Sequence, residues 1–484
     1  MENALSAFVR SAHAPPPKVA VSDQVPAGRG LALIEDVAPG TLLLRVPSTC
    51  LLNPARLARG EAARLAPRRT GESGGNARLS THQFLALLLA LWRAASRASS
   101  RPVSRLDAFF ESLPPAFDTA PLTWATTFRD EPLARALLKA LPDSARMQAA
   151  DVHTRFRRDW RRIRQLQTDD VAGIAAVWRT VAAQDAAVPP MNESDFVWAW
   201  MCVNSRCVFQ DLGYAAHTDN FTLAPLLDMA NHTAVPDLEC KVQYDMRSGL
   251  DLRAPQGQKM GESNAAAGLR CGDEVCITYG PHSNATLLAE YGFVLPLGAG
   301  GSGGSWDGSR FCGVCVDGAV QQMLEDQGEG GAWKRALLEQ SGYWGDYTLH
   351  PVPEPAHPSH RLHLALRLAC VHLDTDRRAK RPRVDAEDRD YTQEQAERIW
   401  RQLTNGQRER ISSANEAAVC ASLVEIADRA KSTCAERAAE LRAAKAAGAP
   451  KALQPAAAMV LQLLEEEQRA AELVRASAQR GDAW

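Results

Sequence analysis

Four short motifs contain the residues whose types and order could support catalysis or ligand binding. They are Gly28-Arg29-Gly30-Leu31, Asn204-Ser205-Arg206, Asp228-Met229-Ala230-Asn231-His232, and Tyr279-Gly280 followed by Tyr291-Gly292-Phe293. Each motif alone also has a structural explanation: a turn before a strand, a strand end or a helix stop. The sequence shows no Ser-His-Asp order, phosphate-binding loop or paired carboxylates that would point to another chemistry.

The cysteines contain one further candidate, Cys312-Gly-Val-Cys315, which has the spacing of half a zinc site or of a redox pair. No second pair stands at zinc-finger spacing. The eleven cysteines are an odd number and lack the regular spacing of a disulfide framework. We therefore expect reduced thiols with structural roles, and no metal site.

Composition and charge exclude several classes of protein. Of the 484 residues, 45% are hydrophobic, enough for two or three domains with their own cores. The net charge of −2 provides no overall positive field, so we expect no direct nucleic-acid partner. The chain has no apolar run of membrane-spanning length and no signal-peptide pattern at its N-terminus. A soluble intracellular protein without a membrane partner is expected.

The order of secondary structure predicts an α+β domain whose sheet is interrupted by helices. Residues 31–34 and 41–46 read as a hairpin around Pro39-Gly40, and a helical block follows from about residue 54 to 190. Strand patterns return at 238–242, 250–253 and 274–278. Strands on both sides of a helical block favour a single sheet-containing domain with a long insertion.

Within the block, apolar residues at helical spacing predict a helix over 81–93 and an amphipathic helix over 155–164. A third helix is expected to start from a cap at Ser194 or Asp195 and to end near Arg206. The loop 256–269, rich in Gly, Ala and Ser, is interpreted as a surface insertion.

A glycine-rich segment marks a domain boundary. Residues 298–308 read GAGGSGGSWDG, a flexible-linker composition, and the chain beyond is nearly all helical, ending in a helix over about 455–476. The predicted division is therefore a first domain over 1–297, with its helical insertion at about 54–190, a linker over 298–310, and a helical domain over 311–484.

Together, in this order, the motifs resemble those of the SET-domain protein methyltransferases, in the branch typified by the Rubisco large-subunit lysine methyltransferase. The resemblance covers nearly the whole chain. The segments that carry it are GRGLALIEDVAPGTLLLRVP, THQFLALLLALW with FFESLPP, FVWAWMCVNSRCVF, LAPLLDMANH and GDEVCITYGPHSNATLLAEYGF, with SHRLHLALRLAC less specific. It implies a β-rich SET fold with a long helical insertion, followed by an all-α substrate-binding domain.

The resemblance also implies a chemistry. S-adenosylmethionine would be the cofactor, a lysine side chain of a protein substrate the methyl acceptor, and the enzyme a monomer. A lysine near its ordinary pKa of about 10.4 is charged at neutral pH, so the site must remove the proton at a cost of about 4 to 5 kcal/mol. A narrow apolar channel beside a positive sulfonium disfavours the charged amine by desolvation and like-charge repulsion.

The residue roles follow from the same resemblance. Tyr279 is expected to be catalytic and to contact the cofactor, its hydroxyl orienting the amine and accepting CH···O contacts from the methyl group. The other expected cofactor contacts are Ala27, Gly28, Arg29, Arg206, Asn231, His232 and Phe293. The expected substrate contacts are Arg206, Asp228 and Tyr291. The sequence leaves open whether His232 contacts the ligand directly or is a buried structural histidine.

Two alternatives to lysine methylation remain. The same branch includes a protein-histidine methyltransferase, and imidazole needs far less deprotonation at neutral pH. The chain could also be an inactive SET fold that serves as a binding module, because a fold alone does not prove activity. The cysteine-rich segments that flank many histone-directed SET domains are absent, which favours a non-histone substrate, ribosomal or otherwise abundant.

A basic tract, Arg377-Arg378-Ala379-Lys380-Arg381-Pro382-Arg383, predicts a cytoplasmic protein with a nuclear fraction, because nuclear import receptors bind such tracts. A solvated loop between two helices is the alternative. Replacing Lys380, Arg381 and Arg383 with alanine should deplete the nuclear fraction in fluorescence microscopy. An unchanged distribution would leave a cytoplasmic protein.

Overall fold

The structure, a computed structural model, describes most of the chain: residues 15–72, 78–99, 102–183, 187–245, 249–256, 269–297, 306, 308–374, 390–448 and 450–482. Chain contacts divide it into two compact units, each discontinuous in sequence. The first comprises Met1–Thr127 and Asp151–His282, and the second Phe128–Ala150 and Ser283–Trp484. The predicted domain boundaries stay predictions. The basic tract and most of the 256–269 insertion lie outside the described residues.

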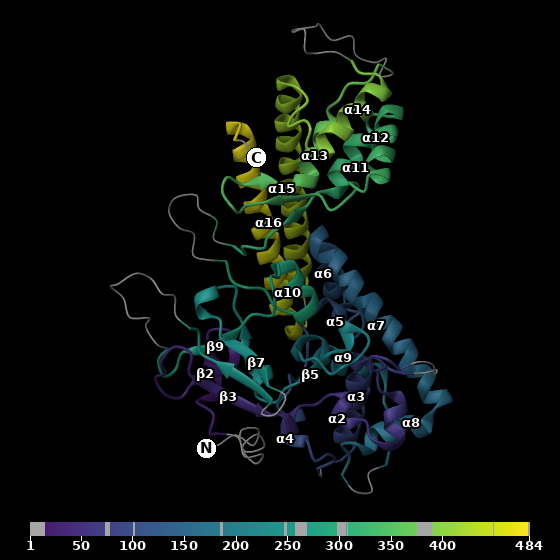
Figure 1. The fold of residues 1–484 in the computed structure, drawn as a ribbon, viewed down its shortest axis with the longest axis vertical. Coiled ribbons are helices and arrows are strands. Elements are labelled where there is room, and N and C mark those ends of the chain that lie inside the picture. The colour runs from purple at the N-terminus through teal and green to yellow at the C-terminus, as the bar shows by residue number, and fades with distance from the viewer. Residues whose placement is uncertain are drawn as a thin grey trace. The chain divides into compact units, whose positions relative to one another are not determined.

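A four-stranded sheet lies in the first unit, with the strand order β1-β2-β9-β6. Its strands are β1 (Val19–Val25), β2 (Gly28–Leu33), β6 (Asn231–His232) and β9 (Glu274–Ile277). The β1/β2 and β2/β9 pairs are antiparallel, whereas β6 and β9 are parallel. Segments more than two hundred residues apart in sequence therefore lie in one sheet (Figure 1).

The predicted hairpin of residues 31–34 with 41–46 is wrong. Gly40 does adopt the left-handed conformation of a turn, at φ 74°. However, β3 (Leu42–Pro47) pairs with β8 (Gly249–Arg253) in a separate sheet of order β3-β8-β7, where β7 is Lys241–Asp245. The actual partner of β2 is β1, because the tight turn at Pro26 and Ala27 lets the chain fold straight back. A third pair joins β4 (Cys207–Phe209) and β5 (Phe221–Leu223).

Helices supply the rest of the first unit. They are α2 (Pro54–Leu57), α3 (Thr81–Ala98), α4 (Asp107–Phe110), α5 (Pro121–Ala125), α8 (Val171–Arg179), α9 (Glu193–Arg206) and α7 (Asp143–Asp169) from Asp151 onward, the first turns of α7 belonging to the second unit. The first turn of α9 is capped by Asn192, which accepts from the backbone N–H of Asp195 at 3.0 Å while Asp195 accepts from Asn192. The expected cap at Ser194 or Asp195 is therefore wrong by two or three residues, because Asp195 is the reciprocal partner of a capping box.

The core of the insertion is formed where α3, α7 and α9 present their apolar sides. Phe156 and Ile163 of α7 are fully buried, as the spacing of the 155–164 segment predicts. Phe156 packs edge-on against Trp200 of α9, with ring centroids 6.0 Å apart. Buried aromatic pairs of this kind contribute about 0.5–1.5 kcal/mol beyond their buried area. They hold α9, which leads to Arg206, in place.

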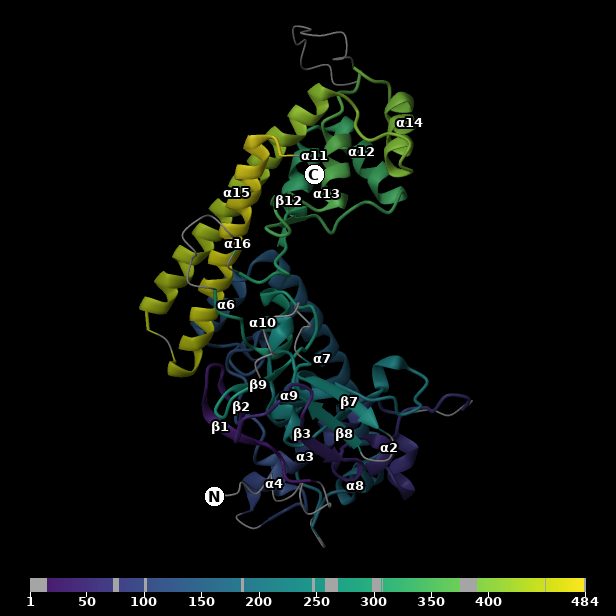
Figure 2. The same cartoon turned by 60° about the vertical axis from the view of Figure 1, so that its left-hand side comes forward.

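The second unit is mainly helical. Its helices are α6 (Pro132–Ala140), α10 (Asn284–Tyr291), α11 (Asp317–Glu325), α12 (Glu329–Gln340), α13 (His360–Ala369), α14 (Gln393–Thr404), α15 (Ser413–Ala446) and α16 (Gln454–Arg480). Figures 1 and 2 show α15 and α16 side by side over much of their length. The predicted α+β class with C-terminal helices is confirmed. The structure adds a small antiparallel sheet of β10 (Val314–Cys315), β11 (Thr348–His350) and β12 (His357–Pro358).

Two adjacent buried carboxyl groups on α16 hold this unit together. Glu466 accepts from the side-chain amide of Asn284 at 3.0 Å and from the backbone N–H of Ser309 at 2.6 Å. Glu467 accepts from the Ser144 hydroxyl at 2.6 Å, and burial raises the pKa of Glu467 to about 8. α16 is thereby joined to α10 and to the first turn of α7.

The raised pKa of Glu467 predicts a pH-dependent stability. Between the ordinary pKa of a glutamate, 4.5, and about 8, the folded chain retains a proton that the unfolded chain releases. Stability should therefore fall as pH rises through this window, by about 1.4 kcal/mol for each pKa unit at most. Glu467→Gln removes the penalty and keeps an acceptor for Ser144. Its gain in Tm over the wild type should grow from pH 5 to pH 8.5.

The matched control is Glu465→Gln, two residues away on the same helix. Glu465 is half exposed and pairs with Arg469 at 2.7 Å, so its removal should give no gain that increases with pH. A Glu467→Gln variant whose Tm difference is the same at both pH values would show that Glu467 is ionised in the folded chain.

Candidate functional site

Two of the motifs are brought together by the parallel pairing of β6 with β9. Asn231 lies opposite Cys276 and His232 opposite Ile277. Tyr279 follows β9 by two residues, so the chain carries it past His232. The rings of His232 and Tyr279 lie with their centroids 5.2 Å apart. The sequence-predicted residues Asn231, His232 and Tyr279 thus form one cluster in the first unit.

Tyr279 is held in place by three hydrogen bonds. Its hydroxyl donates to the carbonyl oxygen of Ala230 at 2.8 Å, and its backbone N–H donates to Nδ1 of His232 at 3.1 Å. Its own carbonyl oxygen accepts from Nε2 of His282 at 3.1 Å. The phenol is therefore oriented from both ends.

His232 acts on Tyr279 as a neutral acceptor. Because Nδ1 receives the Tyr279 N–H, the imidazole proton is assigned to Nε2. Burial, together with the nearby His282, lowers the pKa of His232 to about 4. A neutral, buried ring bonded to backbone supports the structural role for this side chain, which the sequence left open.

Asn231 links the second motif to the first. Its side-chain amide donates to the carbonyl oxygen of Arg29 at 3.1 Å and to the carboxylate of Glu274 at 2.7 Å. A Cβ atom at Gly30 would lie 2.3 Å from this amide nitrogen, so glycine is required there for Asn231 to approach β2. Sequence reasoning missed Glu274, a strand residue without a motif of its own.

The turn between β1 and β2 exposes backbone next to this link. Ala27, Gly28 and Arg29 are all exposed, and Gly28 adopts φ 97°, a conformation that L side chains rarely adopt. Nothing lies within 4 Å of the position a Gly28 Cβ would take. The predicted cofactor contacts of these three residues stay predictions.

Arg206 and Asp228 are brought together as an ion pair. Nη1 of Arg206 donates to the Asp228 carbonyl oxygen at 2.8 Å and lies 3.2 Å from its carboxylate. Burial raises the pKa of Asp228, while the charge and hydrogen bond of Arg206 oppose that rise. The backbone is strained at Leu226, two residues before Asp228, because Leu226 adopts φ 74° although it is not glycine. The charges of these two predicted substrate-binding residues thus offset each other.

The last two predicted residues belong to the second unit. Tyr291 is the final residue of α10, and Gly292 ends the helix in the left-handed conformation at φ 81°. The Tyr291 and Phe293 rings meet edge to face with centroids 6.2 Å apart, and burial raises the pKa of Tyr291 to about 12. Their predicted contacts with substrate and adenine stay predictions.

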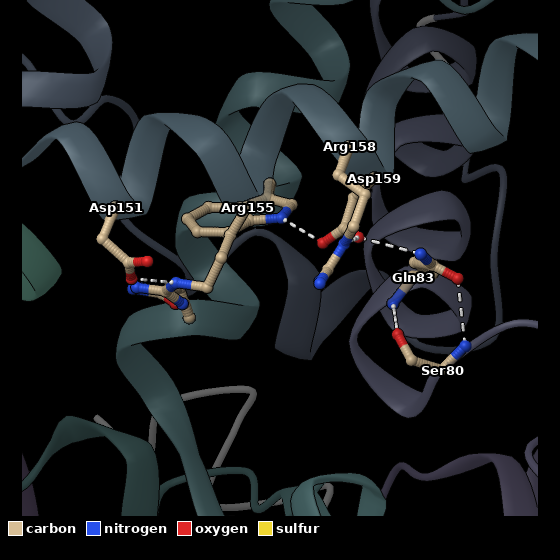
Figure 3. Close-up of polar contacts among 8 residues, drawn as sticks. Ser80, Gln83, Asp151, Arg155, Arg158 and Asp159 are labelled. Carbon is tan, nitrogen blue, oxygen red and sulfur yellow. Dashed lines mark hydrogen bonds and ion pairs between the residues drawn. The ribbon is translucent and has the colours of Figure 1, made fainter.

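A separate cavity of about 730 Å³ lies in the first unit, between α3, α7, α9 and the β4/β5 pair. One wall contains the buried carboxylate of Asp159, which accepts from the Gln83 amide at 2.8 Å and the Trp200 indole at 3.0 Å (Figure 3). Arg158 pairs with it at 3.2 Å. With this many donors, Asp159 serves to join three helices rather than to act as a base.

The described residues contain no group of three or more His, Cys, Asp or Glu side chains suited to a metal ion. All eleven cysteines are free thiols. Burial raises the pKa of Cys315 to about 11, so this thiol has little thiolate character at neutral pH. Within the described residues, no helix is long and apolar enough to cross a membrane.

The fold is similar to that of solved SET-domain structures. No family model matches the chain. A crystal structure described as the SET domain of LSMT bound to lysine and AdoHcy aligns with all of this chain and 92% of its own, with a TM-score of 0.58 and 18% identity. A structure of Rubisco LSMT bound to AdoMet aligns with a TM-score of 0.55 and 18% identity, over all of this chain and 93% of its own. At such identity the likeness establishes the fold.

The sequence relatives of this chain include proteins named as lysine methyltransferases and as SET-domain proteins. Ribosomal lysine N-methyltransferase 2 of Saccharomyces cerevisiae is 29% identical over 44% of this chain and 43% of its own length. Ribosomal lysine N-methyltransferase set11 of Schizosaccharomyces pombe is 23% identical, over 66% of this chain and 63% of its own. SET domain-containing protein 4 of Mus musculus is 26% identical, over 73% and 70%. The chain thus matches less than two thirds of the length of either yeast protein. The predicted resemblance to SET-domain proteins of the Rubisco LSMT-like branch is confirmed by these relatives and solved structures.

Proposed function

We propose that this chain is an S-adenosylmethionine-dependent protein-lysine N-methyltransferase that acts on a non-histone protein. The observation that carries the proposal is the cluster of Asn231, His232 and Tyr279, joined to the exposed turn at Gly28 by the Asn231 amide. The names of the two yeast relatives support lysine as the acceptor and a ribosomal protein as the substrate class.

The residues present fit this cofactor. The exposed backbone of Ala27, Gly28 and Arg29 would hold part of it, and Asn231 would hold the methionine part near the same turn. The neutral His232 adds no positive charge near a sulfonium, and the charge of Arg206 is offset by Asp228. The cluster can thus accept a cationic ligand without like-charge repulsion.

The chemistry is a methyl transfer by nucleophilic displacement at the methyl carbon. When bound, S-adenosylmethionine supplies the methyl carbon, so that the lysine nitrogen forms the new N–C bond while the C–S pair stays on sulfur. Tyr279 would orient the amine, because its hydroxyl is anchored on Ala230 and a phenolic oxygen is an acceptor for CH···O contacts. The proton lost by the amine passes to solvent before transfer, at the cost that burial of the lysine must meet.

The proposal includes the working state of the protein. We infer a monomer present in cytoplasm with a nuclear fraction, supported by the basic tract at residues 377–383. Activity and substrate are tested together by incubating purified protein and radiolabelled S-adenosylmethionine with a cell extract, then identifying the labelled protein. Mass spectrometry of its peptides should find methyl-lysine. Detection of methyl-histidine would show that histidine, and not lysine, is the methyl acceptor. If no cofactor binds at millimolar concentration, the chain would instead be an inactive binding module.

Tyr279→Phe should lower kcat by at least about tenfold and leave cofactor affinity nearly unchanged, since only the hydroxyl at the reacting centre is removed. Steady-state kinetics and calorimetric titration of the cofactor measure the two quantities. Tyr244→Phe is the matched control, because Tyr244 is an exposed residue of β7. A Tyr279→Phe enzyme as active as the control would remove Tyr279 from its proposed role.

Asn231→Ala should instead weaken cofactor binding, by about tenfold or more, because both the Arg29 and Glu274 bonds are lost and the turn at Gly28 loses its support. Calorimetric titration provides the measurement. The control is Asn405→Ala, an exposed residue after α14 in the second unit. Normal cofactor affinity in Asn231→Ala would mean that the wrong motif is assigned to the cofactor.

A further inference from the structure

A second cavity in the first unit is lined mainly by arginine. It has a volume of about 460 Å³, and its lining residues are Arg56, Leu57, Arg59, Arg105, Ala176, Arg179 and Thr180. These come from three separate segments: α2 with the residues after it, the approach to α4, and the end of α8. None of the four motifs contributes to it. We call it the arginine cavity.

Within the part of the chain that the structure describes, no carboxylate forms an ion pair with the arginines of the arginine cavity. These arginines are Arg56, Arg59, Arg105 and Arg179. Arg64, a few residues further along the chain, shows the ordinary arrangement, since it binds Asp170 through two bonds of 2.5 Å. Four unpaired guanidinium groups around one concave surface create a strong local positive potential.

The electrostatics of Arg56 show that this charge has a cost. Arg56 is partly buried. Burial, followed by the charges of Arg59 and Arg105, lowers its pKa, although Cys50 acts in the opposite direction. An anion within the cavity would relieve this repulsion. An anion bound there would lie close to all four guanidinium groups, and charge-assisted hydrogen bonds of this kind are stronger than neutral ones.

Two of the guanidinium groups are already positioned by backbone. Nη1 of Arg56 donates to the Ser48 carbonyl oxygen at 3.2 Å, and Nη2 of Arg105 donates to the Thr180 carbonyl oxygen at 2.7 Å. A guanidinium carries five N–H donors, so one such bond orients the group and leaves others for a ligand. Because these two side chains are already ordered, less side-chain conformational entropy is lost when a ligand binds.

We propose that the arginine cavity binds a compact polyphosphate anion. The planar fork of arginine matches phosphate oxygens, and several phosphates in one small molecule match several guanidinium groups in one cavity. The remaining lining residues, Leu57, Ala176 and Thr180, include no aromatic ring on which a nucleobase could stack. The cavity therefore suits the phosphates of a small molecule better than a nucleic acid, which needs an extended basic groove.

The test is calorimetric titration of the full chain with inorganic tripolyphosphate, with a nucleoside triphosphate as a second arm. We expect saturable binding of one anion per chain, weakened by added salt. Arg59→Gln/Arg179→Gln removes two exposed arginines and should weaken binding at least about tenfold. The control Arg161→Gln/Arg164→Gln removes two exposed arginines from α7, outside the cavity, and should change affinity by less than about twofold.

Circular dichroism and the Tm of the unliganded variants establish that both fold as the wild type does. If tripolyphosphate and triphosphate bind alike, the site recognises phosphates alone; tighter binding of the nucleoside form through the same arginines would also support the site. Equal weakening in both double variants, or no saturable binding, would overturn the proposal. So would single-stranded RNA binding more tightly than tripolyphosphate and being lost in Arg59→Gln/Arg179→Gln.

Discussion

The parallel pairing of β6 with β9 is the constraint on which the candidate site depends. It involves only two residues of β6, yet it places Asn231 and His232 beside the strand that leads to Tyr279. Parallel strands cannot be joined by a tight turn, and here the connection contains the β7/β8 pair of a second sheet. On its other edge β9 pairs with β2, which carries the glycine turn. One four-residue strand thus positions three motifs.

Paired polar groups then give this arrangement a single geometry, and the side chains of Asp159 and Asp228 among them are buried. Asn231 reaches both Arg29 and Glu274, and Tyr279 is bonded through its hydroxyl, its N–H and its carbonyl oxygen. The Arg206–Asp228 pair and the Asp159 cluster do the same for the end of α9 and for the insertion. Buried groups of this kind contribute modest net stability when paired and are costly when one partner is lost. Their main effect is therefore specificity of position.

The sequence was sufficient for features that arise locally. The helices around Phe84 and Phe156 follow from apolar spacing, and the end of α9 at Arg206 was predicted correctly. The motifs themselves were recognisable from residue types in order. Pairings between distant segments were not, and β3 was assigned to β2 because short strands separated by a turn favour a hairpin. Glu274 and the arginine cavity were missed because their residues are scattered along the chain and lack a periodic pattern.

Because the pKa of His232 is low, the hydrogen bond between His232 and Tyr279 does not depend on pH near neutrality. Because this ring stays neutral down to about pH 4, the bond from the Tyr279 N–H to its Nδ1 persists across the physiological range. Below about pH 6.5 the unfolded chain takes up a proton that the folded ring refuses, so acid reduces the stability of the fold before it alters the cluster. Between these limits the scaffold does not titrate at this position. A change of rate with pH in that range would then have a source other than the His232 ring.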